Sequence, residues 1–219
     1  MRVVLFGATG MIGQGVLREC LRDPAVEQVV AVGRGGTAEQ HPKLRQVVHA
    51  DFLDYAAIED QLRGLEACFF CLGVTSAGMR EEAYRRITYG FTLAAAETLV
   101  RLNPAMTFIY ISGAGADRSE HGRSMWARVK GATENALLRL PFKAAYMFRP
   151  GVIIPLDGIR SRTRLYRIGY AVTGPLLPWL YRHFPQYVTT TRQLGRAMIQ
   201  AARSGAPKPI LESADINEL

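Results

Sequence analysis

Cysteine is scarce in this chain of 219 residues, where Cys20, Cys68 and Cys71 are the only three. Three cysteines are too few for a disulfide framework. Cys68 and Cys71 form a C-x-x-C pair, but Phe69 and Phe70 stand between them inside an apolar run. A redox pair normally lies at a turn that opens a helix, and a zinc site needs a second pair of ligands. We therefore interpret both cysteines as buried strand residues and expect no metal site.

Long hydrophobic runs are also lacking. The apolar run at residues 2–6 stops at Gly7, whereas a signal peptide has an apolar stretch of roughly 7–15 residues. The best candidate for a membrane span, residues 168–180, contains Pro175 and Pro178. It is also shorter than the ~18 apolar residues that a span requires. The sequence therefore predicts a cytoplasmic protein without a membrane span.

Acidic residues are missing from one long segment. Residues 158–208 contain nine Lys or Arg and no Asp or Glu, so most of the formal net charge of +8 belongs there. Its cationic and aromatic residues include Arg160, Arg162, Arg164 and Arg167, with Tyr166, Tyr170, Trp179, Tyr181 and Phe184. Such a segment suits an acidic substrate, a partner protein or a peripheral membrane contact, or forms a solvated basic face over an aromatic core. No readout motif accompanies the charge, so nucleic acid is not expected as a partner.

What the sequence does contain is a regular alternation of two patterns. Short β-branched or aromatic runs predict strands at 2–6, 28–32, 45–49, 67–72, 106–111 and 144–149. Longer amphipathic stretches predict helices at 11–22, 54–63, 80–102 and 124–139. Alternation of this kind indicates a doubly wound α/β fold, in which a mostly parallel sheet is covered by helices on both faces.

The last third of the chain follows a different pattern. Thr190 or Thr191 is expected to cap a final helix through about Arg203, and residues 207–211 to add an edge strand. We expect residues 158–203 to form a small basic C-terminal cap over the open end of the sheet. Because no linker or repeat interrupts the chain and 48% of its residues are hydrophobic, residues 1–219 are predicted to form a single domain with a substantial core.

A glycine-rich turn directly follows the first predicted strand. Its seven consecutive residues are Gly7, Ala8, Thr9, Gly10, Met11, Ile12 and Gly13. Glycines let the backbone turn sharply and approach a diphosphate closely, while the helix N-terminus offers free N–H groups to the phosphates. The alternative is a tight turn without a ligand. Because the motif lies in the first strand–helix unit, it predicts a Rossmann-type dinucleotide-binding domain.

The end of the second predicted strand decides which dinucleotide is favoured. An acidic residue about 20 positions after the glycine motif would bind the ribose 2′-hydroxyl of NAD. Residues 28–38 contain no Asp or Glu, and Arg34 lies at that position instead. A guanidinium binds a 2′-phosphate through two hydrogen bonds, so we expect NADP(H) rather than NAD(H) as cofactor. The alternative is that Arg34 is a solvated surface arginine.

With these motifs the chain resembles the short-chain dehydrogenase/reductase superfamily in its atypical and extended branches. The resemblance is to small NAD(P)-binding proteins of the Tat-interacting oxidoreductase type and to epimerase-like bacterial proteins. It covers the chain to about residue 155. It implies a small-molecule substrate that the motifs do not identify. Since relatives commonly dimerise through the long third helix, it also implies a homodimer by analogy.

The resemblance assigns roles to residues at the ends of the predicted strands. Asp51 and Phe52 would contact the adenine, unless Asp51 is an ordinary acid at a helix start. The other cofactor-binding positions are Cys71, Leu72 and Gly73 along the cofactor, and Pro150, Gly151 and Val152 near the nicotinamide. Ser112 stands at the Ser/Thr position of the family's active site.

One catalytic position departs from the family's pattern. Family members use Tyr-x-x-x-Lys, in which the tyrosine transfers a proton while the lysine binds the nicotinamide ribose and lowers the pKa of the tyrosine. The lysine match is Lys130, which the resemblance makes both a cofactor-binding and a catalytic residue. Trp126 stands four residues before it, and Tyr-x-x-x-Lys occurs nowhere in the chain. An indole N–H is not a useful acid near neutral pH.

Three functions stay open at this point. In the first, the protein is an NADP(H)-dependent oxidoreductase or epimerase whose proton comes from Ser112, water or another tyrosine such as Tyr84 or Tyr89. In the second, it binds NADP(H) without turnover, as a redox sensor or scaffold. In the third, Lys130 is an ordinary surface lysine and the chemistry lies elsewhere. Trp126 would stack on the nicotinamide or a flat substrate, or pack in the core.

Overall fold

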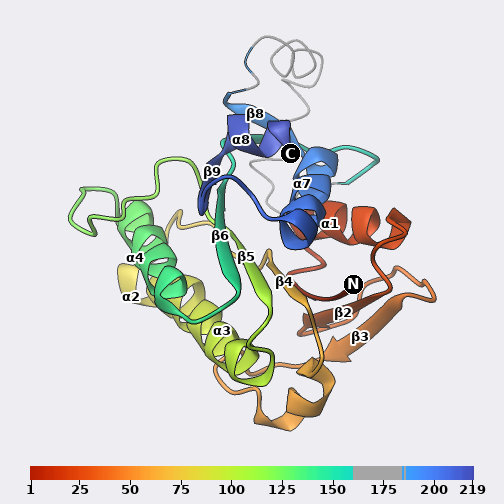
Figure 1. Cartoon of the computed structure of the whole chain (residues 1–219). Helices are drawn as coiled ribbons and strands as arrows, with labels where there is room; N and C mark the ends of the chain where they lie inside the picture. The colour runs from red at the N-terminus through yellow and green to blue at the C-terminus, as the bar shows by residue number, and fades with distance from the viewer. Residues whose placement is uncertain (160–183, 185) are drawn as a thin grey trace.

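Seven parallel strands form the central sheet of the computed structural model, which describes residues 1–159, 184 and 186–219 (Figure 1). The strands are β1 (Arg2–Phe6), β2 (Gln28–Gly33), β3 (Leu44–Val48), β4 (Ala67–Phe70), β5 (Thr107–Ile111), β6 (Ala144–Arg149) and β9 (Ile210–Glu212). Their order is β3-β2-β1-β4-β5-β6-β9. The predicted doubly wound parallel sheet is thereby confirmed. The chain reverses its direction of winding between β1 and β4, which is where folds of this class bind ligands.

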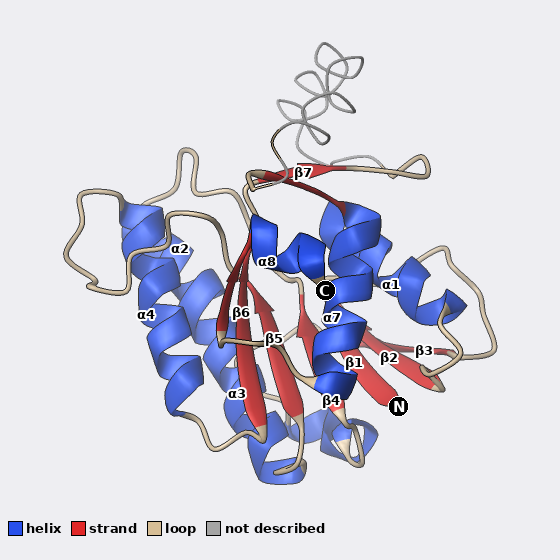
Figure 2. Cartoon of the chain, turned by 45° about the horizontal axis from the view of Figure 1, so that its top comes forward, coloured by secondary structure: helices blue, strands red, loops and turns tan. Residues whose placement is uncertain are grey.

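Helices cover both faces of this sheet (Figure 2). One face carries α1 (Met11–Arg22) and α7 (Thr191–Ser204), and the other carries η1 (Ala56–Leu62), α3 (Phe91–Leu102) and α4 (Met125–Arg139). In β1, Val3 and Leu5 pack into the core beneath α1 and α7, while Val4 and Phe6 pack into the core on the opposite face. A strand that is buried on both sides explains the continuous apolar run in the sequence.

The longest predicted helix, 80–102, is interrupted. It consists of α2 (Glu81–Arg85), a π-helical turn η2 (Arg86–Gly90), and α3. The hydroxyl of Thr92 donates to the carbonyl oxygen of Thr88 at 2.6 Å, which occupies an acceptor of the helix at this point. The predicted helix 54–63 is also altered, because η1 is a shorter 3₁₀ helix. Hydrophobic spacing does not distinguish these helical types, which differ in their backbone hydrogen bonds.

The C-terminal region contains elements that the sequence did not predict. β7 (Val152–Ile154) and β8 (Val188–Thr190) pair in parallel as a separate two-stranded sheet, and α8 (Ser213–Glu218) follows β9. Two predictions are confirmed here. The hydroxyl of Thr190 caps α7 by accepting from the Gln193 N–H at 3.0 Å, and the edge strand expected at 207–211 is present as β9, shifted toward the C-terminus.

Much of the segment expected as a cap, 158–203, lies outside the described residues, including its arginines from Arg160 to Arg182. The described part includes α7, which packs beside α1 against the face of the sheet (Figure 1). Among the residues that the structure describes, no helix has the length and the apolar character needed to cross a membrane.

Helices α1 and α7 approach each other closely because each carries a glycine at the crossing. A Cβ on Gly15 would lie 2.6 Å from the Cβ of Thr191, and a Cβ on Gly195 would lie 3.0 Å from the Cβ of Glu19. The Glu19 side chain is buried beside this crossing, and its carboxylate lies 3.0 Å from Nε of Arg196 on α7. The buried charge is thus paired across the two helices, which ties α7 to the first strand–helix unit.

Gly15→Ala should destabilise the protein by about 1–3 kcal/mol, because overlap of the new Cβ with Thr191 outweighs the gain in helix propensity. Gly35→Ala is the matched control, since a Cβ at Gly35 meets no atom within 4 Å. Urea unfolding of both variants and the wild type measures the free energy of unfolding. Equal stability of the two variants would contradict the close crossing.

Candidate functional site

The glycine-rich turn between β1 and α1 has no room for side chains at two of its glycines. Gly7 has a φ of 80°, and a Cβ on it would lie 2.7 Å from the backbone carbonyl carbon of Cys71. A Cβ on Gly13 would overlap the carbonyl oxygen of Gly7, because α1 starts directly against the end of β1. Both positions therefore require glycine for steric reasons.

The first turn of α1 leaves backbone N–H groups free. Gly10 is the N-cap residue, so no side chain accepts from these groups, and the first turn contains no acidic residue. The N–H of Gly10 itself donates to the carbonyl oxygen of Gly7 at 2.9 Å, which closes the turn. This helix end therefore presents donors and the positive end of its dipole to an anion.

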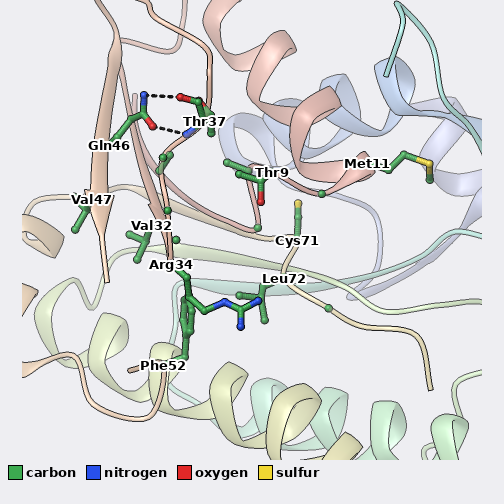
Figure 3. A pocket seen from close by; sticks show the side chains of 18 residues that line it. Thr9, Met11, Val32, Arg34, Thr37, Gln46, Val47, Phe52, Cys71 and Leu72 are labelled. Atoms are coloured by element: carbon green, nitrogen blue, oxygen red, sulfur yellow. Dashed lines mark hydrogen bonds between the residues drawn. The ribbon is translucent and has the colours of Figure 1, made fainter. Parts of the chain in front are cut away.

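A cleft of about 550 Å³ lies at this helix end, beside the carboxyl ends of β1, β2 and β4 (Figure 3). That volume falls in the range of roughly 300–1,000 Å³ typical of ligand pockets. Ten of the predicted cofactor-binding residues line it, namely Gly7, Ala8, Thr9, Gly10, Met11, Arg34, Phe52, Cys71, Leu72 and Gly73. Ile12 and Gly13 follow in the first turn of α1, and Asp51 is not among the lining residues.

Arg34 follows β2, and its side chain extends from there toward Leu72 and Phe52 (Figure 3). The side chain is exposed, and its guanidinium forms no hydrogen bond or ion pair with the described part of the chain. The loop beyond it is held by Gln46 of β3, whose Oε1 accepts from the Thr37 N–H at 2.6 Å. Gln46 Nε2 also donates to the Thr37 carbonyl oxygen at 3.3 Å. A free cation thus lies where an NAD-preferring site would have an acid.

The two predicted adenine contacts are placed differently. Phe52 is buried in the wall of the cleft and packs against Phe91, with 5.6 Å between ring centroids. Asp51 is exposed, and its carboxylate accepts from the Leu53 N–H at 2.9 Å. That bond stabilises the local turn after β3, so the structure gives the Asp51 carboxylate a partner within its own loop.

Cys68 and Cys71 lie on opposite faces of the sheet. Cys68 packs into the core beneath α3, whereas Cys71 packs toward α1 and reaches the cleft (Figure 3). Neither forms a disulfide, and burial raises the pKa of both thiols. The interpretation as a buried strand residue is confirmed for Cys68 but is wrong for Cys71, which follows the end of β4 and is only half-buried. Within the described ranges, no group of three His, Cys, Asp or Glu residues could hold a metal ion.

A buried ionic network lies at the carboxyl ends of β5 and β6. Ser112 Oγ donates to Glu134 Oε1 at 2.5 Å. Arg149 binds the same carboxylate twice, with Nε 2.8 Å from Oε1 and Nη2 2.5 Å from Oε2. Arg149 Nη1 also lies 3.3 Å from Glu212. The Glu134 side chain is fully buried, so its charge depends on these partners.

Glu134 is a site residue that the sequence did not predict. The available signal was its position four residues after Lys130, which places both side chains on one face of α4. That spacing alone says nothing about burial, because acids at the same spacing also form exposed ion pairs on helix surfaces.

Lys130 lies beside the network. Its Nζ donates to the carbonyl oxygens of Ile111 at 3.2 Å and Ser112 at 2.9 Å, and it lies 5.3 Å from the ring centroid of Tyr110. Burial lowers the pKa of Lys130 to about 8, against an opposing influence of Glu134 that raises it. Lys130 is therefore not an ordinary surface lysine.

Trp126 lies one helical turn before Lys130, where the resemblance places a tyrosine. The half-buried ring borders the loop after β5, since a Cβ on Gly113 or on Gly115 would lie 3.8 Å from it. Trp126 thus forms an apolar wall next to Lys130 and supplies no titratable proton.

The two tyrosines considered as alternative proton donors do not line the cleft. Tyr84 on α2 is buried, and burial raises the pKa of its hydroxyl. Tyr89 lies against the guanidinium of Arg85, with 4.6 Å between Cζ and the ring centroid. Neither arrangement favours proton transfer to a ligand in the cleft.

The segment Pro150, Gly151 and Val152 connects β6 to β7 and does not line the cleft. The carbonyl oxygen of Pro150 accepts from the Ala114 N–H at 3.1 Å, which holds the segment against the loop after β5. The Gly151 N–H donates to Ser213 Oγ at 2.9 Å, and Val152 is exposed. These contacts place Pro150 beside the loop after β5 and Gly151 beside the start of α8.

The cleft and the buried network adjoin each other along the sheet. β4 and β5 pair up to Phe70 and Tyr110, so Leu72 and Ser112 each come two residues after the last pair, while Ser112 and Lys130 do not themselves line the cleft. Adjacent strands lie about 4.8 Å apart. A ligand that extends from the glycine-rich turn past Leu72 would therefore meet Lys130 and Ser112.

Comparisons with known proteins agree with this geometry. A family model described as NAD(P)H-binding matches residues 7–139. Protein FMP52-2 of Scheffersomyces stipitis is 26% identical over 211 residues, which cover 95% of this chain and 88% of that protein. Protein HTATIP2 of Rattus norvegicus is 26% identical over 155 residues, which cover 69% of this chain and 62% of that protein. The structure of a dTDP-glucose 4,6-dehydratase from Streptomyces venezuelae with NAD bound has a TM-score of 0.68 and 16% identity, over 94% of this chain and 73% of its own.

These comparisons confirm one prediction and correct another. The Rossmann-type fold and the resemblance to NAD(P)-binding proteins of the epimerase-like and Tat-interacting types are confirmed. The predicted cytoplasmic location is wrong, because FMP52-2 and the fmp52 proteins of Emericella nidulans and Aspergillus fumigatus are named as mitochondrial. The prediction depended on finding neither a signal peptide nor a membrane span, and neither observation bears on delivery to an organelle.

Glu134→Gln should destabilise the protein by about 3–5 kcal/mol, because it leaves the Arg149 guanidinium partly buried without its main partner. Arg149→Met should do the same by stranding the Glu134 carboxylate. The double variant should be more stable than the sum of the two losses implies, and thermal unfolding of all four proteins measures the coupling. Strictly additive losses would show that the two side chains do not interact.

Proposed function

The chain belongs to the NAD(P)H-binding family, and from this premise we propose that it binds NADP(H) in the cleft of Figure 3 and acts as an oxidoreductase or epimerase-like protein. A nicotinamide cofactor supplies or accepts a hydride when it is bound. The protein's own residues bind this cofactor, orient it and transfer the proton that accompanies the hydride.

The observation that supports cofactor binding is the steric constraint at Gly7 and Gly13. A Cβ at either position would collide with backbone, so the turn brings its own amides to the surface of the cleft. Gly10 adds no capping side chain, which leaves these amides free for a diphosphate. Phe52 and the segment from Cys71 to Gly73 would flank the rest of the dinucleotide, since they line the same cleft.

The choice of NADP(H) over NAD(H) depends on Arg34. Its guanidinium is exposed at the end of β2 without a partner among the described residues, and it extends into the cleft (Figure 3). A 2′-phosphate there would supply the missing anion. The absence of Asp and Glu from residues 28–38 also removes the usual partner of a 2′-hydroxyl.

The catalytic part of the proposal rests on Lys130 and Ser112. Both lie at the carboxyl end of β5, next to the strand whose end lines the cleft, and Nζ of Lys130 lies 2.9 Å from the Ser112 carbonyl oxygen. Trp126 takes the place of the tyrosine and closes one side of this region. A substrate bound there would therefore contact a cation, a hydroxyl and an indole.

A second candidate function is binding of NADP(H) without turnover, as a redox sensor or scaffold. It is favoured by the hydrogen bond that Ser112 donates to Glu134, together with the indole at position 126. A hydroxyl whose hydrogen is already donated to a carboxylate is a poor proton source. The two functions predict the same cofactor affinity and differ only in turnover.

Arg34→Ala should weaken NADPH binding roughly tenfold to a hundredfold, which corresponds to the loss of charge-assisted hydrogen bonds, and should leave NADH binding nearly unchanged. Arg45→Ala is the matched control, because Arg45 is an exposed cation of β3 that binds Gln61. Isothermal titration calorimetry with both dinucleotides measures the effect. An unchanged ratio of the two affinities would refute the role of Arg34, and no binding of either dinucleotide to the wild type would refute the whole proposal.

Turnover separates the two functions. The wild type should oxidise NADPH with at least one member of a panel of carbonyl compounds and sugar nucleotides, followed by the loss of NADPH absorbance. Lys130→Ala should reduce kcat about 10²- to 10⁴-fold, as expected for the loss of a catalytic side chain, while NADPH affinity stays largely intact. Tight binding with no turnover across the panel would favour the sensor or scaffold.

A further inference from the structure

The carboxyl end of β5 lacks the tyrosine that would move a proton, yet it contains other polar groups. At the carboxyl end of β5, Ser112, Trp126 and Lys130 carry polar hydrogens beside Gly113, and the hydrogens of Arg149 are directed to Glu134 and Glu212. The indole does not titrate near neutral pH. Ser112 and Lys130 are therefore the two groups to compare.

The hydroxyl hydrogen of Ser112 is already donated to Glu134. Ser112 Oγ lies 2.5 Å from Glu134 Oε1 and must be the donor, because an ionised carboxylate only accepts. Arg149 binds both oxygens of that fully buried carboxylate. Ser112 can therefore accept a hydrogen bond from a ligand, but it has no hydrogen to give.

Lys130 is arranged in the opposite way. Two hydrogens on its Nζ are directed to the carbonyl oxygens of Ile111 and Ser112, at 3.2 and 2.9 Å. An ammonium carries three hydrogens and a free amine carries two, so both forms can make these two bonds. Loss of the third proton therefore breaks no hydrogen bond to the described part of the chain.

The groups around Lys130 act on its pKa in opposite directions. On its own helix, Glu134 favours the ammonium, and from β6 Arg149 offsets part of that charge by binding Glu134. From β5 the ring of Tyr110 lies 5.3 Å from Nζ, and Tyr84 of α2 interacts in turn with Tyr110. Burial outweighs the attraction of Glu134, so the pKa of Lys130 falls to about 8.

We propose that Lys130 is the residue that gives and takes the proton at this site, and that Glu134 is a positioning residue that keeps Ser112 from doing so. This inference rests on the proposed function, since the proton goes to a ligand held beside the cleft. It goes beyond that function by naming the acid that replaces the tyrosine and by giving Ser112 the role of hydrogen-bond acceptor.

With a carbonyl substrate, the hydride and the proton would go to different atoms. With a reduced nicotinamide bound, the carbonyl carbon would gain a hydride and the carbonyl oxygen would gain the third proton of Lys130 Nζ. One C–H and one O–H bond would form, while a C–H bond of the nicotinamide, an Nζ–H bond of Lys130 and the C=O π bond would break. The substrate is reduced, the nicotinamide is oxidised, and Lys130 is left as a neutral amine that regains a proton from water.

The test measures the titration of each lysine in the intact wild-type chain. The chain has only four lysines, Lys43, Lys130, Lys143 and Lys208. Competitive labelling with acetic anhydride from about pH 6 to about pH 11, read by peptide mass spectrometry, gives the pH at which each amine becomes reactive. Lys143 is exposed and serves as the internal reference. Lys130 should reach half reactivity near pH 8, well below Lys143, and coinciding midpoints would overturn the proposal.

Two variants test the role of Glu134. Glu134→Gln should move the midpoint of Lys130 to still lower pH, because the attraction of the carboxylate for the ammonium is lost. If Glu134→Gln does not fold, Glu134→Gln combined with Arg149→Met removes both charges and should keep the midpoint below that of Lys143. Ser112→Ala should leave the midpoint in place, since Nζ binds only the backbone oxygen of Ser112. A shift in Ser112→Ala as large as that in Glu134→Gln would contradict the assigned roles.

NADPH binding, measured by calorimetry on the same samples, distinguishes failure of the proposed function from failure of the proton role of Lys130. No binding to the wild type overturns the proposed function and the proton role with it. Binding together with coinciding midpoints of Lys130 and Lys143 overturns the proton role alone. Where turnover is seen, kcat/KM for carbonyl reduction should fall tenfold per pH unit above the midpoint of Lys130, because the ammonium is the active form. A kcat/KM that stays level across that midpoint would also overturn the proposal.

Discussion

The site depends first on a steric constraint at the start of the chain. The end of β4 passes so close to Gly7, and α1 begins so close to the Gly7 carbonyl oxygen, that only glycine fits at residues 7 and 13. This packing directs the uncapped end of α1 toward the carboxyl edge of the sheet. It also opens the cleft between the ends of β2 and β4, where Arg34 and Leu72 face the same space (Figure 3).

A second constraint acts on the other half of the site. A carboxylate with no exposed surface needs partners, and Glu134 obtains them from Arg149 on β6 and Ser112 after β5. The same network therefore joins α4 to two neighbouring strands and decides the direction of the Ser112 hydrogen bond. Lys130 is left with two carbonyl partners that do not depend on its third proton. The buried charge of Glu134 therefore both holds these elements together and orients the hydrogen bond of Ser112.

The family match and the structural neighbours support conclusions of different detail. The family match covers residues 7–139 and thus includes the turn, the cleft and Lys130. The solved dehydratase is similar in fold at 16% identity, which carries no information about position 126. NAD(P)H binding is therefore a property of the family, whereas proton transfer without the tyrosine depends on side chains that have to be examined in this chain.

Much of this protein was determined locally by its sequence. The alternation of strands and helices, the glycine-rich turn, the cap at Thr190 and the cation at Arg34 all follow from residues within a few positions of each other, so a pattern in the chain reveals them. Tertiary structure alone decided the pairing of β7 with β8 and the burial of Glu134 against Arg149. These features join segments far apart in the chain or depend on how completely water is excluded. The periodicity of a sequence gives neither the contacts between remote segments nor the burial of a polar side chain such as that of Glu134.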